Sequence, residues 1–372
     1  MVLALQYLKL WKKRKTDAAG FFGTPEEIWQ ADEREIGEVF WKNEEHKKAF
    51  FREKAAWDAK KAWNEMQKKG IRFISCEDTS YPQKLKEIYD YPFGLFIRGE
   101  LPKENEKTVA IVGARLCSAY GRHFAVKIAE ELAGYDISLV SGMARGIDGT
   151  AQRAAIKGGG KSYAVLGCGP DICYPMQNRD LYQNLLKNGG VLSEYPPGSS
   201  PLPFHFPMRN RIISGLSKGV LVVEAALRSG SLVTARCALE QGREVFALPG
   251  PIGNPGSEGP HWLIKQGAIL VTEPEEILEN LQFGLHWLPD APENSFYSPD
   301  QEDVALPFPE LLANVGDEVT PVDVVAERAG QPVPEVVTQL LELELAGWIA
   351  AVPGGYVRLR RACHVRRTNV FV

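Results

Sequence analysis

The sequence predicts an α/β protein with an extended Rossmann-like, mostly parallel sheet that carries helices on both faces. A small N-terminal helical domain precedes this sheet, and a C-terminal winged-helix domain follows it. Three observations support the prediction. Short apolar runs alternate with helical stretches in the middle of the chain, a stretch without periodicity follows, and a helix, turn, helix and β-hairpin pattern comes last.

The composition is that of an ordinary globular protein. The 372 residues are 44% hydrophobic and 24% charged, and no apolar run approaches the roughly 20 residues that a membrane span needs. In residues 1–15 the charges follow the apolar stretch, so we expect a first helix there rather than a secretory signal. The six cysteines form no CxxC pair, which favours reduced thiols over a metal site. We therefore expect a cytoplasmic protein without a metal, a cofactor or a membrane contact.

Residues 1–75 are predicted to form the N-terminal helical domain. Glu, Lys, Ala and Trp dominate, and Thr24–Glu27 supplies an N-cap, a Pro at the first helical position and an acidic first turn. A long amphipathic helix that includes Trp57 and Trp63 is expected to end at Gly70. We expect this domain to pack on the one that follows.

Residues 76–283 are predicted to form the Rossmann-like domain. Nearly continuous apolar runs are typical of strands that are buried on both faces, and their alternation with helices gives parallel βαβ units. The predicted strands are Val109–Val112, Ile137–Val140, Ser162–Leu166, Val191–Ser193, Val220–Val223, Val245–Leu248 and Ala268–Val271. The extended stretch Tyr91–Gly99 precedes them. Ligands bind such sheets at the carboxyl ends of the strands.

The last part of the chain is predicted to be a linker and a small domain. Residues 284–315 carry Pro, Asp, Glu and Ser without a sustained period, which is typical of a linker. In residues 316–372, Thr320–Asp323 starts a helix that ends at Gly330, a second helix runs over 334–346, and a hairpin turns at Pro353–Gly355. This order predicts a winged helix, followed by a basic tail.

Three predicted strands run into Gly- and Ser-rich turns that open helices. Glycine lets the backbone approach a ligand closely, and the helix that follows presents free N–H groups and the positive end of its dipole, which favours phosphate. Each turn also holds an arginine, whose planar fork suits phosphate oxygens. The turn residues are Gly113, Arg115 and Ser118 in the first; Ser141, Gly142 and Arg145 in the second; and Arg228, Ser229, Gly230 and Ser231 in the third.

A fourth element, Phe204–Ser214, puts two arginines and an Asn at a helix start beside aromatic residues. Arginines that hold the backbone and a ring that stacks a base are what single-stranded nucleic acid requires. The formal net charge of −4 does not by itself indicate such a protein, so binding must come from a local basic patch. Alternatively, the phenylalanines are core residues, and Arg209 and Arg211 pair with Glu194 or Glu224.

These motifs together resemble the DNA-processing protein A family (DprA, also called Smf). The match is dense over about residues 80–280 and looser in the flanking domains. The matching stretches are Val109–Arg115, Ser141–Asp148, Ala164–Gly169 with Tyr174 and Pro175, Ser193–Pro196, Phe206–Ser214, Val223–Ala225 with Ser229–Ser231, and Gly242–Gly250.

The resemblance implies a homodimeric, non-enzymatic protein. Such a protein binds single-stranded DNA without sequence specificity, protects it, and loads the RecA recombinase onto it during natural transformation (competence) and recombination. It implies DNA contacts at Arg115, Phe206, Arg209 and Arg211, and a SAM or helix-hairpin-like N-terminal domain. Some members carry a Lys where this chain has Pro203, a contact that Lys218 or Arg145 could replace. The predicted DNA-binding residues are Gly113, Arg115, Ser118, Ser141, Gly142, Arg145, Phe206, Arg209, Asn210, Arg211, Lys218, Ser229, Gly230 and Ser231.

Two other functions are considered. One is a nucleotide-processing hydrolase of the lysine-decarboxylase-like group. However, Thr234 is not followed by that group's carboxylate, and we expect Asp148 and Glu194 to serve as caps or ion-pair partners. The other is a sensor that binds a small nucleotide in the same pocket.

The roles of three surfaces remain open in the sequence. The second helix of the winged helix has no Lys or Arg, which favours a protein contact or packing over DNA reading. Apolar residues near Ile264, Leu270 and Ile277 could serve a dimer. The basic tail is either a DNA-backbone contact or a solvated end; its basic residues are Arg358, Arg360, Arg361, His364, Arg366 and Arg367.

Overall fold

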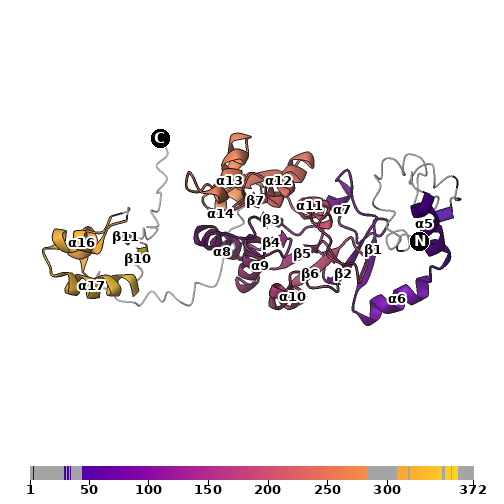
Figure 1. Ribbon diagram of the computed structural model, residues 1–372, viewed down its shortest axis with the longest axis horizontal. Coiled ribbons are helices and arrows are strands. Elements are labelled where there is room, and N and C mark those ends of the chain that lie inside the picture. Colours follow the sequence, from indigo (N-terminus) through magenta and orange to yellow (C-terminus); the bar gives the residue numbers. More distant parts are fainter. Residues whose placement is uncertain are drawn as a thin grey trace, which may run out of the picture. The chain divides into compact units, whose positions relative to one another are not determined.

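The computed structural model of the chain is shown in Figure 1. It describes residues 44–282, 308–316, 319–345, 348–352 and 354–358, together with residues 3, 29, 30, 32 and 34. The chain divides into two compact units, Met1–His286 and Trp287–Val372, and each is described by itself. No helix among the described residues is both long and apolar enough to cross a bilayer.

The first unit is built on a nine-stranded sheet with the order β1-β2-β6-β5-β4-β3-β7-β8-β9 (Figure 1). The seven strands from β6 to β9 in this order run parallel, while β1 and β2 pair antiparallel at one edge. The strands are β1 (Arg72–Ser75), β2 (Gly94–Gly99), β3 (Thr108–Val112), β4 (Ser138–Ser141), β5 (Ser162–Leu166), β6 (Gly189–Ser193), β7 (Gly219–Val222), β8 (Glu244–Ala247) and β9 (Ile269–Leu270). This confirms the predicted fold class.

The apolar runs become strands because both faces of the sheet are covered. Every residue of β3, β5 and β6 is buried. Successive side chains of a strand point to opposite faces, so Ala110 and Val112 join one hydrophobic core while Val109 and Ile111 join the other. The sheet begins slightly earlier than the predicted domain boundary at residue 75, because β1 (Arg72–Ser75) pairs with β2.

Helices cover both faces (Figure 1). One core contains side chains of α7 (Gln83–Lys86), α11 (His205–Gly215), α12 (Gly230–Glu240) and α13 (Pro255–Lys265). On the other face lie α8 (Ala119–Gly134), α9 (Ile147–Lys157), α10 (Arg179–Leu185) and α14 (Pro274–Asn280). The short 3₁₀ helix η2 (Met176–Asn178) leads into α10.

Within residues 44–71, two helices precede the sheet, α5 (Glu44–Ala55) and α6 (Ala59–Lys68). Asp58 caps α6 by accepting the N–H of Lys61, and the helix stops before Gly70, which has a positive φ of 62°. Met66 of α6 packs with Ile71 and with Phe96 of β2. A helix that stops just before Gly70 is therefore present and rests against the antiparallel edge. The predicted longer helix is wrong, because the chain breaks between α5 and α6, and Trp57 lies in that break. Thr24–Glu27 lies outside the described residues.

The second unit contains α15 (Pro309–Ala313), α16 (Val322–Ala329), α17 (Val333–Leu345) and the hairpin of β10 (Ile349–Val352) and β11 (Gly355–Arg358). This is the predicted winged-helix order, and Gly330 ends α16 in the left-handed conformation. However, α15 falls inside the stretch predicted to be a linker, because Leu311 and Leu312 are buried in the core of this unit. Of the basic tail, only Arg358 is described.

Candidate nucleic-acid interface

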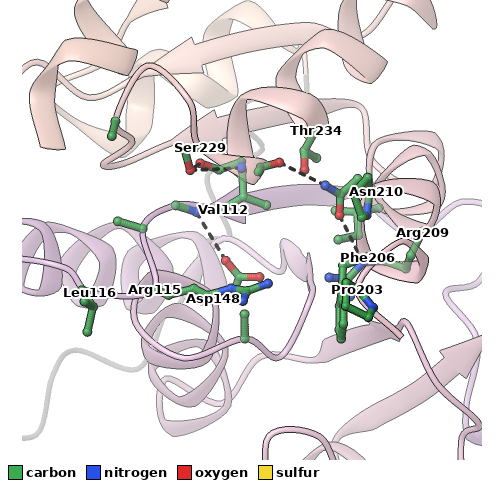
Figure 2. A pocket seen from close by; sticks show the side chains of 18 residues that line it. Val112, Arg115, Leu116, Asp148, Pro203, Phe206, Arg209, Asn210, Ser229 and Thr234 are labelled. Carbon is green, nitrogen blue, oxygen red and sulfur yellow. Dashed lines mark hydrogen bonds between the residues drawn. The ribbon is translucent and has the colours of Figure 1, made fainter. Parts of the chain in front are cut away.

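The main pocket lies where the strand order of the sheet reverses. From β3 the chain continues to β4 on one side, and it later returns to β7 on the other. A pocket of about 480 Å³ opens at the carboxyl ends of these strands, which is where open α/β sheets bind ligands (Figure 2). The pocket is lined by residues 112–116 at the end of β3, by Ala144 and Asp148 after β4, and by Ala226, Ser229–Ser231 and Thr234 after β7, together with the start of α11. The structure therefore brings the three predicted turns together.

The turn after β7 offers hydrogen-bond donors to the pocket. Ser229 is the N-cap of α12, with its Oγ accepting the N–H of Ser231, and the two hydroxyl oxygens lie 2.7 Å apart. Asn210 of α11 donates from Nδ2 to the carbonyl oxygen of Gly230 (3.1 Å), which holds α11 against this turn. The first turn of α12 thus lies at the pocket, where the positive end of the helix dipole favours an anion.

Asp148 fastens the other two turns together. Only 6% of the residue is exposed. Its Oδ1 accepts the N–H of Gly113 (3.3 Å; Figure 2). Its Oδ2 accepts the N–H of Gly142 (3.1 Å). Burial raises the pKa of this carboxyl group, while the nearby Arg209 and the two backbone N–H groups act to lower it. The carboxylate therefore serves as a hydrogen-bond acceptor for the backbone of two turns in the pocket floor. This agrees with the expectation that Asp148 has a structural rather than a catalytic role.

Arg209 forms part of the floor rather than the rim. The residue is 5% exposed. Its Nη1 donates to the carbonyl oxygens of Gly142 (3.1 Å) and Val165, and its Nε donates to Oδ1 of Asn210 (3.2 Å). Burial lowers the pKa of the guanidinium, and Asp148 opposes this shift. Arg209 thus contributes positive charge from beneath while it joins the ends of β4 and β5.

Arg115 and Phe206 stand at the entrance (Figure 2). Arg115 is exposed, and its guanidinium carbon lies 5.7 Å from the centroid of the Phe206 ring. Phe206 is half-buried, and its ring passes close to Gly167, where an added Cβ would lie 3.0 Å from a ring carbon. A small residue at position 167 therefore lets the ring sit at the pocket wall with the cation beside it.

A second, smaller hollow of about 40 Å³ adjoins the first. It shares Arg115, Ala144, Phe206 and Arg209 with the main pocket and adds Gly142, Arg145, Tyr174 and Pro175. The sequence reasoning missed Tyr174 as a site residue. Tyr174 lies in the loop after β5, which starts at the same sheet edge as the three turns. Applying the rule that ligands bind at the carboxyl ends of parallel strands to β5 as well would have identified this residue.

Arg211 is not brought to the pocket. Its Nη2 pairs with Oε1 of Glu194 (2.7 Å) and its Nε with Oδ2 of Asp90 (3.2 Å), and it donates to the carbonyl oxygens of Asp90 and Met208. Its side chain is 10% exposed and that of Glu194 is 1% exposed. Arg211 thus follows the alternative given in the sequence analysis, an ion pair with Glu194.

Three further predicted residues also lie away from the pocket. Ser118 caps α8 and its Oγ donates to Glu224 (2.5 Å), and the Oγ of Ser141 donates to the carbonyl oxygen of Ile111 (2.6 Å). Lys218 precedes β7 and therefore lies at the amino end of the sheet, where its N–H donates to the carbonyl oxygen of Thr108. These two serines hold the turns in shape, whereas Lys218 lines a different hollow.

Comparisons with known proteins agree with this architecture. Residues 72–282 match the model of the family described as DNA recombination-mediator protein A, and residues 298–355 match the DprA winged helix domain. Protein Smf of Escherichia coli (strain K12) is 72% identical over 300 residues, which are 80% of each chain. DNA processing protein DprA of Streptococcus pneumoniae is 48% identical over 210 residues, 56% of this chain and 74% of that protein.

Solved structures are similar as well. The X-ray structure of DprA from Streptococcus pneumoniae has a TM-score of 0.64 and 39% identity, and the match covers 73% of this chain and 95% of that one. DNA processing protein A from Helicobacter pylori, solved to describe its single-stranded DNA binding mode, has a TM-score of 0.51 and 28% identity over 58% of this chain and 98% of that one. This chain belongs to the DNA recombination-mediator protein A (DprA) family.

Proposed function

We propose that this chain is a cytoplasmic, non-enzymatic protein that binds single-stranded DNA without sequence specificity in the main pocket. The observation that carries the proposal is the exposed Arg115 beside the half-buried ring of Phe206, above a floor that contains Arg209 and the start of α12. Arginine holds phosphate, and a ring stacks any base, because every base has a π-face. The Helicobacter pylori relative, which binds single-stranded DNA, supports the same reading.

The geometry favours binding over hydrolysis. Both oxygens of Asp148 accept backbone N–H groups, and Glu194 pairs with Arg211, so each carboxylate already has a bonding role.

As part of the same proposal, the bound strand is protected and passed to the RecA recombinase during DNA uptake and recombination. On α17, Val333, Val337 and Leu341 are exposed at helical spacing, and the helix holds three Glu but no Lys or Arg. This face suits a protein partner better than DNA.

Self-association as a homodimer is also part of the proposal. Leu270 lies on the short edge strand β9 and is 45% exposed, and Ile264 is half-buried nearby. Ile277, the third residue that the sequence suggested, is fully buried in the core beneath α14. The edge formed by β9 is thus the surface that an interface would use.

Arg115→Ala is expected to weaken binding of oligo-dT about tenfold or more, because a charge-assisted contact to phosphate is lost. The measurement is a titration with labelled oligo-dT and with duplex of equal length at two salt concentrations. Lys218→Ala, at the other end of the sheet, is the control and should bind like the unaltered protein. Equal affinities for Arg115→Ala and the unaltered protein would remove the proposed site.

The same titration separates the alternatives. A nucleotide sensor would bind thymidine monophosphate more tightly than oligo-dT and show little salt dependence, whereas a DNA-binding protein shows the opposite. A hydrolase would turn over nucleoside monophosphates, and Asp148→Asn or Glu194→Gln would abolish that turnover. Neither result is expected.

Asp148→Asn is expected to abolish the part of the pH dependence of oligo-dT binding that comes from a carboxylate beneath the bound phosphate. It also costs one of the two backbone hydrogen bonds, because its amide NH2 cannot accept the N–H of Gly113 or Gly142, so the affinity of the variant is compared with itself across pH. In the unaltered protein, burial raises the pKa of Asp148, and a bound phosphate disfavours its ionised form further. Affinity should therefore fall as pH rises through the pKa of Asp148. Titrations over a pH series with both proteins test this, and an equal fall in the variant would exclude Asp148 as its cause.

A further inference from the structure

The two adjoining pockets differ in the ligand group that each can hold. The main pocket has room for a nucleoside, and apolar side chains such as Val112, Leu116 and Ile213 line part of it. The smaller hollow, at about 40 Å³, has room for roughly three water-sized groups, because each needs about 10–15 Å³. It is therefore too small for a base.

The smaller hollow has the lining of a phosphate site. Arg115, Arg145 and Arg209 border it, together with the backbone of the turn after β4 at Gly142 and Ala144. Arg145 is exposed, directly before the positive-φ Gly146 that starts α9. Guanidinium groups match phosphate oxygens in geometry as well as in charge.

An exposed ring continues the path beyond this hollow. Tyr174 is 41% exposed, and its ring centroid lies 5.5 Å from that of Phe206 at an interplanar angle of 36°. Phe206 borders both pockets, while Tyr174 borders only the smaller one. The two rings are thus neighbours, with Phe206 shared by the two pockets and Tyr174 at the smaller one.

We infer that consecutive nucleotides of the strand occupy these features in order. One nucleoside lies in the main pocket, the phosphate that links it to its neighbour lies between Arg115 and Arg145, and the neighbouring base stacks on Tyr174. This inference rests on the proposed function and adds Tyr174 as a DNA-contacting residue. It also explains why a polynucleotide would bind better than a mononucleotide, which cannot fill all three positions.

The test uses the full chain with labelled oligo-dT. Tyr174→Ala should lower the affinity roughly five- to hundredfold through loss of one stacked base, and Tyr174→Phe should keep it. Arg145→Ala should lower the slope of log affinity against log salt by about 0.7, the value for one phosphate contact with a single strand. The controls are Tyr135→Ala, equally exposed at the far end of α8, and Lys157→Ala, at the far end of α9.

The outcomes separate the two levels of the proposal. If the unaltered protein does not bind oligo-dT, or Arg115→Ala changes nothing, the proposed function itself fails. If binding depends on Arg115 but Tyr174→Ala and Arg145→Ala behave like the controls, only the inferred path is wrong. An equal loss in Tyr174→Phe and Tyr174→Ala would overturn stacking as the cause. Arg145 is exposed, so its variant keeps the test decisive even if Tyr174→Ala fails to fold.

Discussion

Arg211→Met is expected to lower the free energy of unfolding of the sheet-containing unit by about 3–5 kcal/mol. Glu194 is almost completely buried, and removal of Arg211 would leave its charge in the protein interior without its cation. Burial alone would lower the pKa of Arg211, but Glu194 raises it, so the arginine stays charged. Unfolding in urea, followed by circular dichroism, measures the difference.

Two variants show whether the buried pair is the cause. Arg211→Met with Glu194→Met removes both charges and should recover much of the loss, because no unpaired charge remains. Arg236→Met breaks an ion pair with Glu240 whose partners are 80% and 61% exposed, and should cost less than about 1 kcal/mol. If Arg211→Met unfolded at the same urea concentration as the unaltered protein, the pair would not stabilise the fold as described.

Gly146→Ala is expected to cost about 3 kcal/mol of unfolding free energy and also to weaken oligo-dT binding. Gly146 has φ 73° and ψ −131°, a backbone conformation that only glycine adopts readily. An added Cβ would clash with the carbonyl oxygen of Ala114 and would lie 2.6 Å from that of Arg115. The turn that carries Arg115 would therefore have to move away from α9.

Gly242→Ala is the matched control for this prediction. Gly242 also has a positive φ, 66°, but an added Cβ would meet nothing within 4 Å. Its substitution should cost only about 1–2 kcal/mol through backbone strain and should leave oligo-dT binding unchanged. Equal effects of the two substitutions in urea unfolding and in titration would contradict a steric role for position 146.

Much of the sheet could be predicted because its strands are buried on both sides. Ser162–Leu166 was predicted with the bounds it has in β5, and the other parallel strands differ by one or two residues at their ends. The helix α15 escaped prediction because five residues give too short a pattern to show a period. Its contribution to the core comes from packing against α16 and α17, which sequence spacing cannot reveal.

The site could be predicted as far as the strand ends but not at the level of individual side chains. Residues two apart on a helix point in very different directions, so Arg209 and Arg211 cannot both face one pocket. The sequence alone did not show which of the two arginines faces the pocket. In the structure, Arg211 pairs with the buried Glu194, which leaves Arg209 at the pocket. Lys218 could have been excluded earlier, because it precedes a parallel strand and thus lies at the wrong edge of the sheet.

The hydrogen bonds from Gly113 and Gly142 to Asp148 have a consequence for how a ligand is received. With both turns already fastened, a strand that arrives meets a rim that needs little rearrangement, so little conformational entropy is lost on association. The protein should then change its conformation little when it binds DNA. Differences in affinity among oligonucleotides should appear mainly in how long each stays bound, rather than in how fast it arrives.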